Sequence, residues 1–160
     1  MRQAVLLIGG NLGDRLHLLR QAEDYLEMVF TIIRMSSVYE SDAWGDNSEG
    51  DYLNRVIIIE TELEPEEMLK QAQTIEDKLE RERIRKWGNR TMDIDILYID
   101  GEIIQTPTLT VPHPYIQKRR FVLVPLCELL PAFIHPVLGK THAQLLEACT
   151  DEGDVRLFEE

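Results

Sequence analysis

The stretch Trp87-Gly-Asn-Arg90-Thr-Met-Asp93-Ile-Asp95-Ile-Leu-Tyr-Ile99 decides how the rest of this chain is arranged. Its second half predicts a β-strand, because isoleucine, leucine and tyrosine fill most of it. Aspartate is depleted in strands, yet Asp93 and Asp95 stand inside this one. Side chains two residues apart share one face of a strand at a spacing of roughly 6.6 Å, so the two carboxylates point the same way.

Two carboxylates on one face of a strand repel each other unless a cation lies between them. Mg²⁺ is the natural candidate, since it takes one or two carboxylates and completes its octahedron with water and phosphate oxygens. The alternative is a solvated edge strand with two exposed aspartates. The Asp-x-Asp pair by itself favours that alternative.

Five cations immediately upstream favour the metal site instead: Arg81, Arg83, Arg85, Lys86 and Arg90. Guanidinium groups in this number are typical of a site that grips a polyanion. A helix surface with ion pairs is the bland alternative, because Glu80 and Glu82 interleave with the cluster. Those pairs account for Arg81 and Arg83 but not for Arg90, which the pattern places beyond the helix.

The chain has 160 residues with 44% apolar and 29% charged side chains, which predicts one domain, residues 1–160, with a sizeable core. We find no signal peptide and no apolar stretch near the ~20 residues of a membrane span, so we expect a cytoplasmic protein without membrane contact. Cys127 and Cys149 lack metal-ligand spacing and are expected to be reduced. The net charge of −12 argues against a general binder of nucleic acid or anionic membranes.

Hydrophobic patterning predicts the order of the elements. Strands are expected over residues 3–8, 32–41 and 52–62 and in the Asp93 stretch, with a short return strand over 102–104 after an Asp100-Gly101 hairpin turn. Helices are expected after an N-cap at Asp14, after Pro65, over residues 122–130 and over 142–149. The acidic tail, residues 151–160, is expected to fray or to add an edge strand.

The order through residue 99 is strand, helix, strand, strand, helix, strand. This order predicts an α+β, ferredoxin-like βαββαβ fold, in which two helices pack on one face of an antiparallel sheet and a C-terminal helical extension follows. That fold hosts many functions and decides none of them.

Three further side chains suggest a binding surface. Tyr52 and Asn54 share one face of their strand, and asparagine is disfavoured in strands, so the pair suggests a platform for stacking and hydrogen bonding to a flat ring. A strand end that meets solvent is the alternative. Trp44 lies in a polar loop, where it is either a packing staple or part of a lid over a ligand.

Taken together, these motifs resemble the 6-hydroxymethyl-7,8-dihydropterin pyrophosphokinases of folate biosynthesis. The hallmarks occur in order over nearly the whole chain: the Gly-Gly-Asn-Leu-Gly-Asp turn of residues 9–14, Tyr52-Leu-Asn54, Glu76 followed by Arg81-x-Arg83, the stretch from Trp87 to Leu97, Val111-Pro-His113-Pro, and Arg119 with Phe121. Gly10, Asp42, Trp44, Glu80, Lys86 and Asn89 depart from the family pattern, but none of these changes removes a chemical role.

The resemblance implies that ATP donates its β,γ-diphosphate to the hydroxymethyl oxygen of the pterin and that AMP leaves. It implies that Asp93 and Asp95 hold two Mg²⁺ ions between the phosphates and the acceptor hydroxyl, and that Arg81 and Arg90 close on the reacting phosphates. Such transfers depend on in-line positioning and charge neutralisation more than on covalent chemistry. The expected partners are ATP and the pterin, and the expected state is a monomer.

The resemblance also implies two sets of binding residues. The residues expected to bind ATP are Arg83, His113 and Arg119 at the phosphates, Gln73 and Glu76 at the nucleoside, and backbone near Ile96, Thr108 and Leu109 at the adenine. The residues expected to bind the pterin are Tyr52 and Phe121 on its two faces, Asn54 and backbone of Ser41, Asp42 and Ala43 at its polar edge, and Trp44 nearby.

Two rival functions stay open at this point. A nucleotidyltransferase also combines a Gly-Gly or Gly-Ser turn with an Asp-x-Asp pair, but there the pair follows the turn closely, whereas Gly10 and Asp93 are far apart in this chain. Release of AMP supports a diphosphotransferase and release of pyrophosphate supports the rival. A non-catalytic module that binds a ligand on a ferredoxin-like sheet is the second rival, and it has no need of paired acids or clustered arginines.

Overall fold

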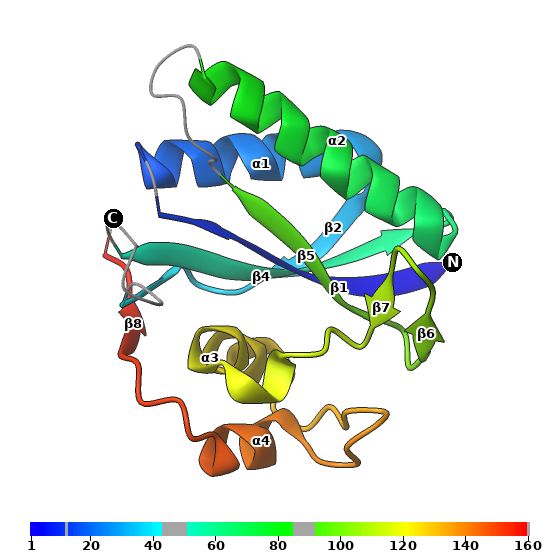
Figure 1. Ribbon diagram of the computed structural model, residues 1–160, viewed down its shortest axis with the longest axis vertical. Coiled ribbons are helices and arrows are strands. Elements are labelled where there is room, and N and C mark those ends of the chain that lie inside the picture. The colour runs from blue at the N-terminus through cyan, green and yellow to red at the C-terminus, as the bar shows by residue number, and fades with distance from the viewer. Residues whose placement is uncertain (12, 43–50, 85–91, 160) are drawn as a thin grey trace.

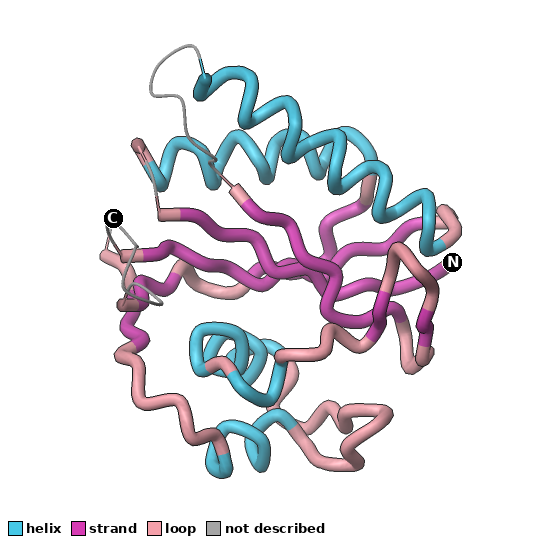
Figure 2. The backbone as a smooth tube through the Cα atoms, in the orientation of Figure 1, coloured by secondary structure: helices cyan, strands magenta, loops and turns pink. Residues whose placement is uncertain are grey.

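Helices cover both faces of a central antiparallel sheet (Figures 1 and 2). The computed structural model describes residues 1–11, 13–42, 51–84 and 92–159. Its strands are β1 (Arg2–Gly10), β2 (Thr31–Met35), β3 (Tyr39–Ser41), β4 (Tyr52–Thr61), β5 (Asp93–Ile99), β6 (Ile104–Gln105), β7 (Thr110–Val111) and β8 (Val155–Leu157). Its helices are α1 (Arg15–Val29), α2 (Pro65–Ile84), the 3-10 turn η1 (Ile116–Lys118), α3 (Arg120–Leu129) and α4 (His142–Ala148).

The order of the strands confirms the predicted fold. The main sheet runs β5-β1-β4-β3-β8, and β2 also pairs with β4. The pairings β1–β4, β1–β5, β2–β4 and β3–β4 are all antiparallel, as a ferredoxin-like sheet requires. β1 lies between β4 and β5, which explains its unbroken apolar run: all residues from Ala4 to Gly10 are buried. The acidic tail adds an edge strand, β8, beside β3.

One predicted strand is divided in two. The apolar pattern predicted a single strand over residues 32–41, but the structure has β2 and β3 with a break around Ser36. At the break, Ser36 N–H donates to Val56 O (2.9 Å) and Val56 N–H donates to Ser36 Oγ (3.0 Å). The serine side chain therefore replaces a backbone carbonyl as the acceptor, and both halves continue to pair with β4.

The segment after β5 also differs from the prediction. Asp100 makes the expected turn, with a φ of 49°, and its carboxylate accepts a hydrogen bond from Gln3 N–H. However, the next strand, β6, pairs with β7 rather than returning along β5. One edge of β5 pairs with β1. Away from that pairing, the backbone of β5 is contacted by the segment after β7, because His113 N–H donates to Leu97 O (3.0 Å).

The sheet has a separate apolar core on each face. Alternate residues of β1 divide between them: Leu6 and Ile8 pack with α1 and α2, whereas Val5 and Leu7 pack with α3 and α4. The register of β5 against β1 shifts between Val5 and Leu6, so Leu97 and Tyr98 both join the core under α3. In the part of the chain that the structure describes, no helix is long and apolar enough to cross a membrane.

A buried tyrosine–histidine pair attaches the α3–α4 layer to the sheet. Tyr98 OH lies 2.9 Å from His142 Nε2, and His142 Nδ1 lies 2.7 Å from Leu130 O. A carbonyl only accepts, so Nδ1 carries the proton and Nε2 accepts from Tyr98 OH. The His142 ring also stacks on Phe133, with centroids 5.3 Å apart. The neutral form of His142 therefore fits this site.

Protonation of His142 should weaken the fold. Burial lowers its pKa below the usual 6.5, and the charge of His135 lowers it further. Below about pH 6.5 the unfolded chain thus binds a proton that the folded chain resists, so stability falls as the pH decreases. His142→Gln should be less stable than wild type at pH 7 but should lose less stability between pH 7 and 5.5. Thermal unfolding of both proteins between pH 7 and 5.5 measures this difference, because a change of 1 kcal/mol in stability shifts the melting temperature by roughly 2–4 °C. Equal slopes for both proteins would contradict the assignment.

Candidate active site

The register of three strands gathers the predicted polar residues. Gly9 of β1 lies opposite Asn54 of β4 on one side and opposite Asp93 of β5 on the other. Two residues earlier, Leu7 lies opposite Asp95. Residues that face each other across an antiparallel pair point to the same side of the sheet. Asp93, Asp95 and Asn54 therefore lie on the face that carries α3.

These residues line a cavity of about 200 Å³ between the sheet and the start of α3. Its described lining is Leu7, Gly9, Asp42, Tyr52, Asn54, Asp93, Asp95, Arg119 and Phe121. Sequence analysis named all of these except Leu7 and Gly9. The signal for Gly9 was present, because a glycine inside a strand often marks a close approach of another group. The motif of residues 9–14 predicts that Gly9 belongs to a turn after the strand, whereas Gly9 lies inside β1.

Gly9 makes room for Asn54. A Cβ at position 9 would lie 1.9 Å from Asn54 Nδ2 and 2.7 Å from Leu53 O, so no side chain fits there. Asn54 Nδ2 donates a long hydrogen bond to Ile8 O (3.5 Å). Among the described residues, Asn54 Oδ1 and Ser41 Oγ are buried without a hydrogen-bond partner. A buried unpaired polar atom costs about 1–3 kcal/mol, so both atoms suit a ligand with a polar edge.

The donor set of the cavity fits Mg²⁺. Three carboxylates, those of Asp42, Asp93 and Asp95, line it together with one guanidinium group, that of Arg119, among the described residues. This balance favours a cation over a bare polyphosphate. Mg²⁺ takes one or two carboxylates and fills its remaining positions with water and substrate phosphates, so the pair Asp93 and Asp95 fits this ion.

Aromatic rings hold Arg119 at the cavity. Its guanidinium carbon lies 4.9 Å from the centroid of the Tyr115 ring and 5.7 Å from that of the Phe121 ring. Arg119 directly precedes α3, whereas Phe121 lies in its first turn. A guanidinium group held between rings is restricted in orientation and well placed to meet an anion.

His113 lies beside this arginine in a neutral state. Burial lowers its pKa, and the charge of Arg119 lowers it further. Tyr115 N–H donates to His113 Nδ1 (3.2 Å), so the proton of the neutral ring sits on Nε2. His113 can therefore donate a hydrogen bond to a phosphate oxygen without contributing a charge.

The other residues expected at ATP lie along α2, β5 and the segment that contains β6 and β7. Glu76 of α2 accepts a hydrogen bond from Ile94 N–H of β5 (2.7 Å), between the two aspartates. Thr108 Oγ1 donates to Glu66 at the start of α2 (2.8 Å), which ties the β6–β7 segment to that helix. Ile96 and Leu109 are buried, whereas Gln73 is exposed on α2. None of these residues is among those described as lining the cavity.

Several predicted residues lie outside what the structure describes. Arg90, Ala43 and Trp44 are outside the described residues, and so are the side chains of Arg81 and Arg83 at the end of α2. The backbone N–H of Asp42, expected to meet the pterin, donates to Asp154 O (3.2 Å). That donor already has a partner within the chain.

Comparison with known proteins agrees with the motifs. Residues 5–131 match the family described as 7,8-dihydro-6-hydroxymethylpterin-pyrophosphokinase. The Aquifex aeolicus protein called 2-amino-4-hydroxy-6-hydroxymethyldihydropteridine pyrophosphokinase is 41% identical to this chain over 88% of each chain. The Bacillus subtilis protein of the same name is 38% identical over 98% of this chain and 90% of its own length.

A solved structure agrees with the fold. The wild-type HPPK-DHPS protein of Plasmodium falciparum superposes with a TM-score of 0.71 over 92% of this chain at 17% identity. This chain spans 44% of that protein's length, so the likeness concerns the fold of one part of it. The family match covers most of the chain, including the cavity residues of β1, β4 and β5. The chain belongs to the 7,8-dihydro-6-hydroxymethylpterin-pyrophosphokinase family.

Proposed function

We propose that the cavity over Gly9 is where this chain performs the reaction of its family: transfer of diphosphate from ATP to the hydroxymethyl group of 6-hydroxymethyl-7,8-dihydropterin. This reaction is a step of folate biosynthesis, and ATP is the co-substrate. The observation that carries the proposal is the meeting of paired carboxylates with a buried, unpaired amide oxygen in one cavity. The first group suits a metal-bound phosphate, and the second suits the polar edge of a flat ring.

The pterin end of the cavity is formed by β4 and α3. Tyr52 of β4 and Phe121 of α3 both line the cavity, and we propose that the pterin stacks between their rings. Offset stacking contributes about 0.5–1.5 kcal/mol beyond the burial of area. Asn54 Oδ1 would accept from an N–H of the ring, and Ser41 Oγ offers a second buried polar atom nearby. These contacts would discriminate a pterin from an apolar ring of the same size.

The phosphate end is formed by β5. We propose that Asp93 and Asp95 would hold two Mg²⁺ ions when ATP binds. Magnesium bound there would neutralise phosphate charge and lower the pKa of the attacking hydroxyl. The strand fixes both carboxylates on one face, and Glu76 fixes the backbone between them through Ile94 N–H. The carboxylates are therefore held in place before any ligand binds.

In the transfer, the hydroxymethyl oxygen forms a bond to the β-phosphorus as the bond to the oxygen of AMP breaks, and the hydroxyl proton is released to solvent. Negative charge develops on the leaving oxygen of AMP along this path, so donors aimed at the phosphates stabilise the transition state. Arg119 and the Nε2–H of His113 are suited to grip the phosphates of ATP. We propose that Arg81, Arg83 and Arg90 add further charge and that Gln73, Ile96, Thr108 and Leu109 contact the nucleoside.

The chain as a whole is proposed to act as a single domain and as a cytoplasmic monomer. Its net charge of −12 gives nucleic acid no general surface to bind. Mass analysis of the products from ATP, Mg²⁺ and the dihydropterin alcohol tests the function directly. AMP together with the pterin diphosphate supports it. Pyrophosphate with a nucleotidylated pterin would instead support a nucleotidyltransferase, and binding without turnover would support a non-catalytic module.

Removal of one acidic ligand tests the metal assignment. Asp95→Asn keeps the size of the side chain but halves the charge of the pair, and we expect AMP formation to fall by roughly 10²-fold or more. The melting temperature should stay near that of wild type, because the Asp95 carboxylate opens to the cavity. Asp24→Asn, an exposed change on α1, is the matched control and should retain activity. Wild-type activity in Asp95→Asn at limiting Mg²⁺ would remove the carboxylate from the mechanism.

A methyl group at position 9 tests the pterin end. Gly9→Ala would force Asn54 away, so we expect KM for the pterin to rise by at least about tenfold, a loss of ~1.4 kcal/mol, while KM for ATP changes little. Asn54→Ala removes the amide without a clash, and KM for the pterin should again rise while KM for ATP changes little. Gly101→Ala is the control, since its Cβ would meet nothing within 4 Å. Equal losses for both substrates in Asn54→Ala would contradict the assignment.

A further inference from the structure

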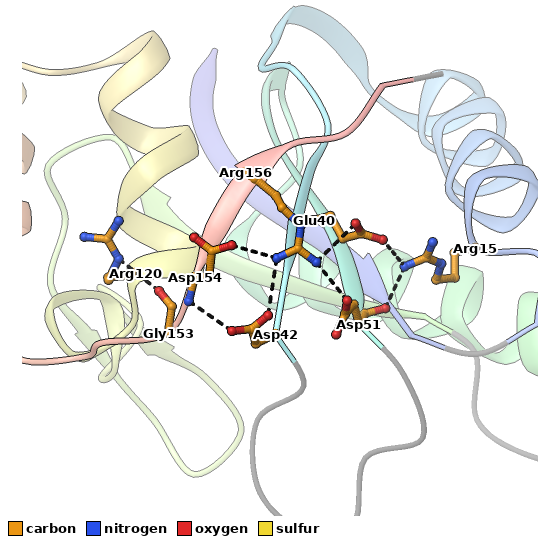
Figure 3. Close-up of polar contacts among 8 residues, drawn as sticks. All are labelled: Arg15, Glu40, Asp42, Asp51, Arg120, Gly153, Asp154 and Arg156. Carbon is orange, nitrogen blue, oxygen red and sulfur yellow. Dashed lines mark hydrogen bonds and ion pairs between the residues drawn. The ribbon is translucent and has the colours of Figure 1, made fainter.

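The C-terminal segment connects two walls of the cavity that come from distant parts of the chain (Figure 3). One wall is the start of α3, where Arg120 directly precedes Phe121. The other wall is formed by Asp42, just after β3, and Tyr52, at the start of β4. Residues 151–157 run between these walls, and β8 pairs with β3 at the edge of the sheet.

The first anchor of this segment is at α3. Arg120 N–H donates to Asp151 Oδ2 (3.0 Å), and Arg120 Nε donates to Gly153 O (3.1 Å). The N-cap residue of the helix, Arg119, makes no side-chain capping hydrogen bond. The Asp151 carboxylate therefore accepts an N–H at the start of α3 from a different part of the chain, where negative charge is favourable.

The second anchor is at the ends of β3 and β4. Asp42 N–H donates to Asp154 O (3.2 Å), and Asp154 N–H donates to Asp42 Oδ2 (3.3 Å). Arg156 of β8 then reaches carboxylates on both strands: Glu40 (3.2 Å) and Asp42 (3.3 Å) at β3 and Asp51 (2.8 Å) beside β4. It also pairs with Asp154 (2.9 Å). The Arg156 guanidinium group thus connects Asp42, which lines the cavity, to Asp51, which directly precedes Tyr52.

The charge balance at this anchor depends on Arg156. An isolated exposed ion pair contributes little to stability, but here one guanidinium group is shared among several carboxylates. Arg15 of α1 supports the same cluster from the other side, through Glu40 (2.8 Å) and the backbone oxygen of Asp51 (2.9 Å). Without Arg156, the carboxylates of Asp42, Asp51 and Asp154 would lose the guanidinium group that they share in the described contacts, and Arg15 reaches only Glu40 and the backbone of Asp51.

We propose that Arg156 is a positioning residue for pterin binding, because it and the segment around it hold Asp42 and Tyr52 at a fixed distance from Phe121. The inference rests on the proposed function, since the ligand is the pterin of the same cavity. A flat ring gains stacking energy only when both walls lie at contact distance. Asp93 and Asp95 lie on β5, at the opposite end of the sheet from β8, so the effect should concern the pterin and spare ATP.

The test compares three variants of the full-length chain by steady-state kinetics against each substrate. In Arg156→Gln, KM for the pterin should rise about five- to tenfold, the equivalent of ~1–1.4 kcal/mol, and KM for ATP should stay within about twofold. Arg156→Lys restores the charge and should recover part of the loss. Arg2→Gln is the matched control, because Arg2 also bridges two carboxylates, Glu64 and Glu102, at a remote surface.

In Arg156→Gln, either an unchanged KM for the pterin or equal losses for both substrates would overturn the inference. A loss in Arg2→Gln as large as in Arg156→Gln would also overturn it, since the effect would then be general destabilisation. If Arg156→Gln does not fold, Asp51→Asn removes the partner of Arg156 that directly precedes Tyr52 and should give the same difference between the two substrates, and an unchanged KM for the pterin there is equally fatal. Absence of AMP from the wild-type reaction would instead refute the proposed function.

Discussion

β1 runs between β4 and β5, and its register on both sides puts Asn54, Gly9 and Asp93 in one row across the sheet. The missing side chain in the middle of this row is what the site depends on. Because Gly9 has no Cβ, the Asn54 amide can lie over the backbone of β1 at the lining of the cavity, with its oxygen buried and without a described partner. A shift of either pairing by one residue would turn the polar groups of that strand toward the other core.

The two faces of the sheet have separate tasks. The face under α1 and α2 is an apolar core formed by residues such as Leu6, Ile8 and Ile57. The opposite face is apolar only where α3 and α4 cover it, and it becomes polar toward Gly9, where the start of α3 contributes Arg119 and Phe121. Arg119 and Phe121 are close in sequence, but the other lining residues come from strands. A small cavity can therefore combine aromatic, amide, carboxylate and guanidinium groups.

Much of this could be predicted from the sequence because it depends on local patterns. Hydrophobic spacing and the order of the elements gave the ferredoxin-like sheet, and aspartates in an apolar strand indicated the carboxylate pair. The break at Ser36 could not be foreseen, since it depends on a hydroxyl that replaces a carbonyl across the sheet. The role of Gly9 could not be predicted, because it depends on Asn54 lying opposite Gly9 in β4. The role of Arg156 could not be predicted, because its partners at the cavity wall, Glu40, Asp42 and Asp51, lie more than 100 residues away in the chain. Arg81 and Arg90 stay predictions.

The central claim is that one cavity takes a metal–nucleotide complex at Asp93 and Asp95 and a pterin at Asn54. A crystal structure with Mn²⁺, a non-hydrolysable ATP analogue and 6-hydroxymethylpterin tests it most directly, because the anomalous signal of manganese locates each ion independently of the protein. We expect manganese bound by both carboxylates, and the pterin between Tyr52 and Phe121 with its polar edge at Asn54 Oδ1. Ions bound elsewhere, with the two carboxylates turned away from the phosphates, would contradict this account.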